Sequence, residues 1–244
     1  MLIYSVCYYY GKNKLNNINN HLKELNKIDE EKIFILNVMI DNHDLTYHNK
    51  VKTELSNYID LHNCFILTSY NWGGTILGLW MTYKYCYGKY DNSSYLVHFE
   101  EDFGPYNDKW YEHSKNLLLS DDYIYVGESN LGDDDIYIGE SNIGKVKTKN
   151  DDRRLTYKGF RNSIRLGDPE VWTSGGFYFT ILGNLKEIED KIGIFHKGNQ
   201  NTNRKNNYIL DGIDIGEVGF PTLLYHAGFK FNALLRKTYF VHDW

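Results

Sequence analysis

The chain has 244 residues, which is enough for one large α/β domain and too few for two. Its formal net charge of -5 excludes a protein that follows a nucleic-acid backbone, because such proteins need a basic surface. No apolar run approaches the roughly 18 residues of a membrane span. The first residues indicate a strand rather than a signal peptide, and the three cysteines lack a C-x-x-C spacing. We therefore expect a cytoplasmic protein, located in the host cell if the gene is viral.

Strand and helix patterns alternate through the first half of the chain. Short apolar runs rich in β-branched residues predict buried strands at 2–7, 33–40, 64–68 and 94–99. Apolar residues spaced three and four apart predict amphipathic helices at 15–28, 51–62 and 73–87. Strands that alternate with helices form parallel sheets through right-handed crossovers. The pattern predicts an α/β fold with a mostly parallel central sheet flanked by helices.

The second half of the chain is less regular and predicts a smaller, mixed β region. The segment 125–132 recurs almost unchanged at 137–144, which indicates a duplicated strand and turn. Further strands are expected around 170–181 and 231–241, with helices at 185–192 and 215–227. No linker separates the two halves, so we expect one domain over 1–244.

Polar residues follow the predicted parallel strands at the edge where an open sheet binds its ligands. They are Tyr8, Tyr10, Asp41, Asn71, Gly73, Glu100, Glu101 and Asp102. Asp41 is suited to hydrogen-bond a nucleobase or ribose, although an aspartate that stabilises its own turn is an equal alternative. Asn71 and Gly73 permit close backbone approach and present amide groups at a helix start, a favourable place for a phosphate.

The acidic turn, defined as Glu100, Glu101 and Asp102, directly follows the strand predicted at 94–99. Its carboxylates are the hard oxygen ligands that Mg²⁺ takes, usually one or two together with substrate phosphates. A solvated turn is the alternative for an isolated acidic triplet. Its position after four alternating units favours a site for Mg²⁺ or Mn²⁺.

Two segments carry a resemblance to a known family. Residues 68–74, Thr-Ser-Tyr-Asn-Trp-Gly-Gly, and residues 95–103, Tyr-Leu-Val-His-Phe-Glu-Glu-Asp-Phe, resemble family 2 glycosyltransferases and their GT-A relatives. Asn71 and Gly73 take the places of the family's Asn-x-Gly, and Glu100 and Asp102 take the outer places of its Asp-x-Asp metal motif. Glu100 departs from the aspartate of that motif. The chain also has no Gln-x-x-Arg-Trp, which disfavours a processive polysaccharide synthase.

The resemblance implies a single GT-A (Rossmann-like) domain, with a half that binds the nucleotide sugar at 1–104 and a half that binds the acceptor at 105–244. It implies a metal-dependent hexosyl or pentosyl transferase that uses Mn²⁺ or Mg²⁺. The donor would be a UDP-linked sugar, and the acceptor a glycan or another hydroxyl compound. Transfer with inversion is expected. Neither a nucleic acid nor a membrane span is expected, and the oligomeric state stays open, a homo-oligomer included.

The resemblance also implies roles for residues late in the chain. A general base is expected among Asp211, Asp214 and Glu217, although an acid there can instead cap the following helix. We expect His242 to join Asp102 and Glu100 at the metal, with a plain surface histidine as the alternative. Aromatic and small residues expected to shape an acceptor pocket, or else to pack in the sheet and form a bulge, are Trp172, Gly175 and Gly176.

Two rival functions remain at this point. A nucleotidyltransferase acting on sugar phosphates also combines an α/β sheet with metal-binding acids. It would need a Gly-rich loop with Arg or Lys after the first strand, which residues 8–14 fit poorly. A non-catalytic carbohydrate-binding protein rich in tyrosine would not need the acidic turn.

Overall fold

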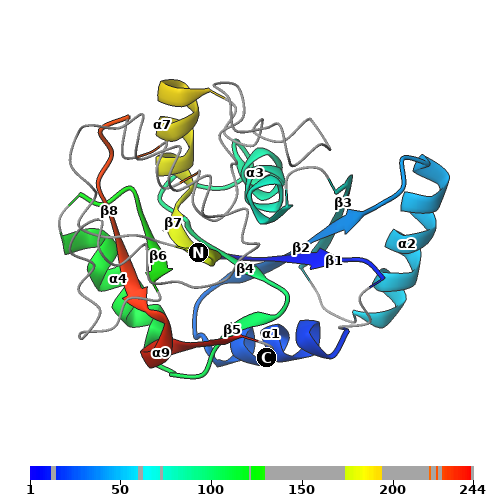
Figure 1. Cartoon of the computed structure of the whole chain (residues 1–244), viewed down its shortest axis with the longest axis horizontal. Coiled ribbons are helices and arrows are strands. Elements are labelled where there is room, and N and C mark those ends of the chain that lie inside the picture. Colours follow the sequence, from blue (N-terminus) through cyan, green and yellow to red (C-terminus); the bar gives the residue numbers. More distant parts are fainter. Residues whose placement is uncertain are drawn as a thin grey trace, which may run out of the picture.

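A computed structural model describes residues 1–11, 15–59, 63–71, 74–120, 122–129, 174–193, 220, 224 and 227–242. A sheet of seven strands runs through the middle of this part of the chain (Figure 1). The elements in chain order are β1 (Leu2–Tyr9), α1 (Leu15–Lys27), β2 (Lys32–Ile40), α2 (Leu45–Tyr58), β3 (Cys64–Tyr70), α3 (Gly74–Cys86), β4 (Tyr95–Glu100), β5 (Phe103–Pro105), α4 (Trp110–Ser120), β6 (Tyr125–Ser129), β7 (Ser174–Ile181), α7 (Leu182–Ile192), β8 (Phe231–Leu235), α9 (Arg236–Tyr239) and β9 (Phe240–His242).

The strands of this sheet lie in the order β3-β2-β1-β4-β7-β6-β8. β1 pairs in parallel with β2 and with β4, β2 with β3, and β6 with β8. β7 is antiparallel to both of its neighbours, β4 and β6, so the other strands of the sheet all point the same way. A small second sheet pairs β5 with β9. The expected fold class, α/β with a mostly parallel central sheet and a mixed region in the second half, is confirmed.

The sheet has an apolar core on each face, because successive side chains of a strand point to opposite sides. In β1, Tyr4 and Val6 join the core that also receives α1, α2 and α4, whereas Ile3 and Cys7 join the core that receives α3 and α7. In Figure 1, α3 and α7 lie above the strands and α1 lies below them. No helix in the described ranges is both long and apolar enough to cross a membrane.

Most of the predicted elements are present, but helix α4 was not expected. Its buried residues include Trp110, Ser114 and Leu118, which recur every four residues and form one face. Ser114 contributes no apolar surface to that pattern, and its hydroxyl donates to the carbonyl of Trp110 at 2.8 Å. The polar residue in the middle of the buried face hides the helix from a search for apolar periodicity.

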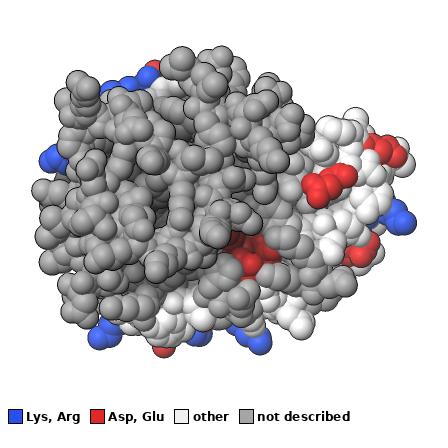
Figure 2. Space-filling model, viewed as in Figure 1, with Lys and Arg blue, Asp and Glu red and all other residues white. Residues whose placement is uncertain are grey.

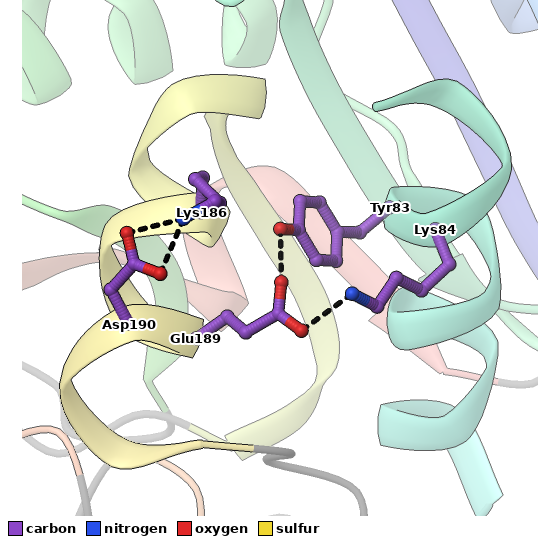
Figure 3. A network of polar contacts seen from close by, with 5 residues as sticks. All are labelled: Tyr83, Lys84, Lys186, Glu189 and Asp190. Carbon is purple, nitrogen blue, oxygen red and sulfur yellow. Dashed lines mark hydrogen bonds and ion pairs between the residues drawn. The ribbon is translucent and has the colours of Figure 1, made fainter. Parts of the chain in front are cut away.

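Helices α3 and α7 are joined by polar contacts between their facing sides (Figure 3). The Tyr83 hydroxyl and the Lys84 ammonium group both donate to the carboxylate of Glu189. Burial alone would raise the pKa of Glu189, but these two partners lower it overall. Lys186 and Asp190 form a second ion pair within α7. Partly exposed pairs of this kind contribute little stability, so the apolar core supplies most of the contact between the two helices.

Candidate functional site

The carboxyl ends of β1, β2, β3 and β4 meet at one edge of the sheet. Three backbone hydrogen bonds join them, each from an amide to a carbonyl: Tyr10 to Met39 (3.0 Å), Asn71 to Ile40 (3.1 Å) and Glu101 to Cys7 (2.9 Å). The predicted ligand-binding residues Tyr10, Asp41 and Asn71 therefore lie beside one another, with the acidic turn at the end of the row. Parallel strands place their carboxyl ends at the same edge of the sheet, so these residues lie close together although they are far apart in the sequence.

The acidic turn is held on both sides along the chain. At its middle residue, Glu101, the turn is tied to β1 through the backbone amide. After it, the ring of Phe103 packs on Gly176 of β7, where an added Cβ atom would lie 2.7 Å from the ring. Phe103 also pairs with the backbone of His242 across the β5–β9 ladder. Glu101 is 1% exposed and the two outer acids are partly exposed, so Glu100 and Asp102 are the better placed to meet a ligand.

A buried histidine lies beneath the acidic turn. His21 of α1 is fully buried, and its Nδ1 lies 3.0 Å from the Tyr4 hydroxyl. Burial lowers the pKa of His21 to about 3, although the backbone of Glu100 and Glu101, which faces the ring, acts in the opposite direction. His21 is therefore neutral at physiological pH. A neutral imidazole supports the turn from below without adding a positive charge that would compete with a cation ligand.

Tyr9 is a residue of this site that the sequence interpretation did not select. A Cβ atom on Gly74, at the start of α3, would lie 3.3 Å from the Tyr9 hydroxyl. Burial raises the pKa of Tyr9, and the charges of Cys7, Glu100 and Glu101 raise it further. The phenol thus stays protonated between the start of α3 and the acidic turn. Gly74 has a φ of +54°, a conformation that favours glycine.

The two tyrosines that were selected have other positions. Tyr8 is 2% exposed and lies in the core beneath the sheet, on the side of α1 and α2. Tyr10 donates a hydrogen bond to Glu54 of α2 at 3.0 Å and meets the ring of Tyr47 edge-on. Since neighbours along a strand alternate between faces, Tyr9 points toward α3 where Tyr8 does not. Tyr9 replaces Tyr8 as our candidate. Strand alternation separates the two residues, but the sequence alone does not say which of them faces α3.

Asp41 and Asn71 stand at the open end of the row. Asp41 is exposed just beyond β2, and Asn71 is partly exposed just beyond β3. Beside them, the rings of His43 and Tyr70 stack with centroids 3.6 Å apart. Neither ring was selected from the sequence. They place an aromatic surface next to the two polar side chains.

Gly176 was predicted to shape an acceptor pocket, and in the structure it packs against the ring of Phe103. On β6, Gly127 pairs with Tyr178 but the next residue, Glu128, pairs with Ser174, so β7 bulges at residues 175–177. The bulge and the contact between Gly176 and Phe103 agree with the alternative stated for this glycine pair, packing within the sheet. Gly175 lies in the same bulge, and its surroundings are not described.

Several predicted site residues lie outside the described residues. They are Gly73, Trp172, Asp211, Asp214 and Glu217. For His242 the backbone alone is described, and it pairs with Phe103 of β5, the residue that follows Asp102 in the chain. The predicted catalytic acids thus have no described position relative to the row of strand ends.

The electrostatic character of this edge suits a cation. Figure 2 shows acidic side chains near the middle of the face, while the described lysines and arginines of that view lie around its rim. Glu100 and Asp102 are two partly exposed carboxylates, the number that Mg²⁺ would take alongside phosphate oxygens. Within the described residues, no group of three or more His, Cys, Asp or Glu side chains is placed to hold a metal by itself. A resident ion would therefore need oxygen ligands from the substrate or a side chain such as that of His242.

Comparison with known proteins gives a distant structural likeness. No protein-family model and no curated protein sequence matches the chain. Its fold is similar to that of S. aureus TarS 1–349 in complex with UDP-GlcNAc, with 13% identity over 98% of this chain and 57% of that one and a TM-score of 0.45. A second structure of TarS 1–349 has 14% identity over 98% and 59%, with a TM-score of 0.44. The chain spans less than two thirds of these structures, and a likeness this distant assigns no activity.

Proposed function

We propose that the chain is a glycosyltransferase whose nucleotide-sugar donor binds at the carboxyl edge of the sheet. The observation that carries this proposal is the acidic turn, which is tied to β1 through Glu101 and lies in one row with the ends of β1, β2 and β3. Open α/β sheets bind their ligands at this edge. Polar side chains that end in a pair of carboxylates suit a ligand with a nucleoside, which they can hydrogen-bond, and a diphosphate, which a cation can join to the carboxylates.

Each part of the row suits one part of such a donor. Asp41 is exposed at the end of β2 and is available to hydrogen-bond a base or ribose, with the stacked rings of His43 and Tyr70 beside it. Asn71 stands just before α3, whose first amides point toward the same edge and favour phosphate oxygens. We take UDP as the nucleotide, since it is the commonest in the family that the sequence resembles.

A divalent cation is the natural partner of the outer acids. Asp102 and Glu100 would hold Mn²⁺ or Mg²⁺ together with diphosphate oxygens, and His242 would supply a further ligand from β9. When bound, such an ion neutralises the charge that develops on a departing nucleoside diphosphate. Tyr9, whose pKa is raised, would remain a hydrogen-bond donor beside these carboxylates.

The proposed reaction moves one sugar with inversion. The acceptor hydroxyl oxygen attacks the anomeric carbon, and the bond between that carbon and the β-phosphate oxygen breaks. The electron pair leaves with the nucleoside diphosphate, and a carboxylate takes the acceptor proton. We assign that carboxylate to Asp214, Glu217 or Asp211, and the acceptor, a glycan or other hydroxyl compound, to the part of the chain that includes Trp172 and Gly175.

A ligand-stabilisation screen tests this proposal. UDP-sugars would be added to the whole chain with and without Mn²⁺, and the unfolding temperature followed. Ligand at about 100 times its Kd adds about 2.7 kcal/mol, which raises the Tm of a chain of this size by roughly 5–10 °C. Product analysis with an acceptor library then tests for release of UDP, as expected here. A separate incubation with UTP and a sugar 1-phosphate tests the rival, because release of pyrophosphate there would indicate a nucleotidyltransferase.

Two variants sharpen the screen. Asp102→Asn should remove the Mn²⁺-dependent part of the stabilisation. Asp108→Asn is a matched control. Asp108 is 81% exposed, its ion pair with Lys27 at 3.1 Å lies on the surface, and the substitution makes the same charge change. Equal responses of the two variants, or no response of the wild-type chain to any nucleotide sugar, would contradict the proposal.

A further inference from the structure

A buried polar network crosses the middle of the sheet on the face covered by α3. Its members come from β1, β2, β4 and α3, and each is at most 4% exposed. They are Ser5, Asn37, His98, Thr75 and Thr82. Burying a polar group costs free energy unless the group is hydrogen-bonded, so the bonds among these five side chains decide whether the network stabilises the fold.

The protons of this network can be assigned from the partners and from the burial of the imidazole ring. His98 Nε2 lies 2.9 Å from the carbonyl oxygen of Thr75, which can only accept, so Nε2 carries the proton. Burial lowers the pKa of His98 to about 3, so the ring is neutral and Nδ1 accepts from the Ser5 hydroxyl at 2.8 Å. Asn37 donates to Ser5 and to Thr82, both at 2.8 Å. Thr82 then donates to Ser5 at 2.7 Å, so the donors of Asn37, Ser5, Thr82 and the His98 ring each have an acceptor.

The network reaches the candidate site at both of its ends. Thr75 follows Gly74 in the first turn of α3, and His98 stands two residues before Glu100 in β4. The helix lies so close to the ring that a Cβ atom on Gly78 would be 2.9 Å from His98 Cε1. Such contact leaves the start of α3 little freedom relative to the end of β4.

We propose that His98 is a positioning residue whose Nε2–H bond to the Thr75 carbonyl fixes the first turn of α3 beside the acidic turn. The bond sets the distance between the helix amides that face a phosphate and the carboxylates that follow β4. His98 itself has no contact with the ligand in this assignment. The identity of the ligand, a nucleotide sugar, rests on the proposed function, whereas the bond and its effect on α3 do not.

Two isosteric substitutions separate the two bonds of the ring. The amide nitrogen of glutamine lies where His98 has Nε2, so His98→Gln keeps a donor for Thr75 and loses the contact with Ser5. The amide of asparagine lies where His98 has Nδ1, so His98→Asn keeps a partner for Ser5 and leaves the Thr75 carbonyl without the bond. Thr82→Val is a control within the same network, since it removes a buried hydroxyl without touching the His98–Thr75 bond.

The first measurement is amide hydrogen exchange over residues 75–79, which needs no ligand. We expect about ten-fold faster exchange there in His98→Asn, from the loss of one hydrogen bond, and little change in His98→Gln and Thr82→Val. The second is affinity for UDP-sugar with Mn²⁺, where the same order should appear, about ten-fold weaker for asparagine alone. Equal exchange in the glutamine and asparagine variants would overturn the proposal.

The wild-type protein gives an independent check that does not depend on whether a variant folds. NMR of the histidine ring should find His98 as the neutral Nε2–H tautomer with a slowly exchanging proton; the Nδ1–H tautomer would overturn the assignment. If no nucleotide sugar binds the wild-type chain, the proposed function fails. The exchange and tautomer results would still decide the role of His98.

Discussion

Acidification should destabilise this protein before its carboxylates are protonated, because two neutral histidines are fully buried. Burial lowers the pKa of His21 and of His98 from 6.5 to about 3. Below pH 6.5 the unfolded chain takes up these protons and the folded chain does not, so protonation draws the equilibrium toward the unfolded state. The stability is fully present above pH 6.5 and is lost as the pH falls from 6.5 toward 3.

The size of the effect follows from the two pKa values. Each pH unit below 6.5 costs about 1.4 kcal/mol per histidine until the folded pKa is reached. Going from pH 7.5 to pH 5.5 should therefore cost about 1.4 kcal/mol for each ring and about 3 kcal/mol for the pair. Against the 5–15 kcal/mol typical of a native domain, this is a large fraction.

Urea unfolding at pH 7.5 and pH 5.5 measures this loss directly. The window lies above the range where Glu30 and Glu189 act, because partners lower the pKa of both carboxyl groups. His98→Gln and His21→Gln cannot titrate, so each variant should lose about half as much stability over the window as the wild-type chain. A wild-type stability that is flat between the two pH values, or variants with an unchanged loss, would refute the assignment of buried neutral histidines.

Three further predictions concern the site. Asp102→Asn should abolish sugar transfer at limiting Mn²⁺ while the Tm stays near that of the wild type, because a partly exposed acid at a strand end contributes little packing. Normal turnover in this variant would contradict the metal hypothesis. Gly176→Ala should lower stability by about 1–3 kcal/mol, since its Cβ atom would overlap the Phe103 ring; an unchanged urea midpoint would mean that the ring moves freely. Asp214→Asn and Glu217→Gln should be assayed separately, and the variant of the general base should lose about 10²–10⁴ in transfer rate while its donor affinity is kept. Normal rates in both variants would exclude both acids as the general base.

The parallel half of the sheet could be predicted because its strands carry an unambiguous signal. The buried runs that became β1, β2 and β4 are apolar on both faces and are separated by helices of the right length. Alternation then requires parallel pairing, and the observed register puts the ends of these strands together. The position of Asp41, Asn71 and the acidic turn along one edge follows from the same rule.

Other features depend on contacts that no local pattern contains. β7 lies antiparallel between β4 and β6. The sequence pattern of the second half predicts strands but does not say which strands pair, because the pairing depends on packing. The choice between Tyr8 and Tyr9 depended on which face of β1 meets α3, and three adjacent tyrosines look alike in a sequence. Buried His21 and His98 resemble any other histidine until their partners are known.

The acidic turn is supported from both faces of the sheet, and this arrangement explains why neutral histidines are found there. His21 supports the turn from the core shared with α1, and His98 joins β4 to the start of α3 from the opposite core. A lysine or arginine at either place would pair with the carboxylates and lower their affinity for a cation. An aliphatic residue would fill the space but leave the Tyr4 hydroxyl or the Thr75 carbonyl with one bond fewer. A buried imidazole provides both a donor and an acceptor without charge, so it fixes the turn while leaving the negative charge of Glu100 and Asp102 available to a ligand.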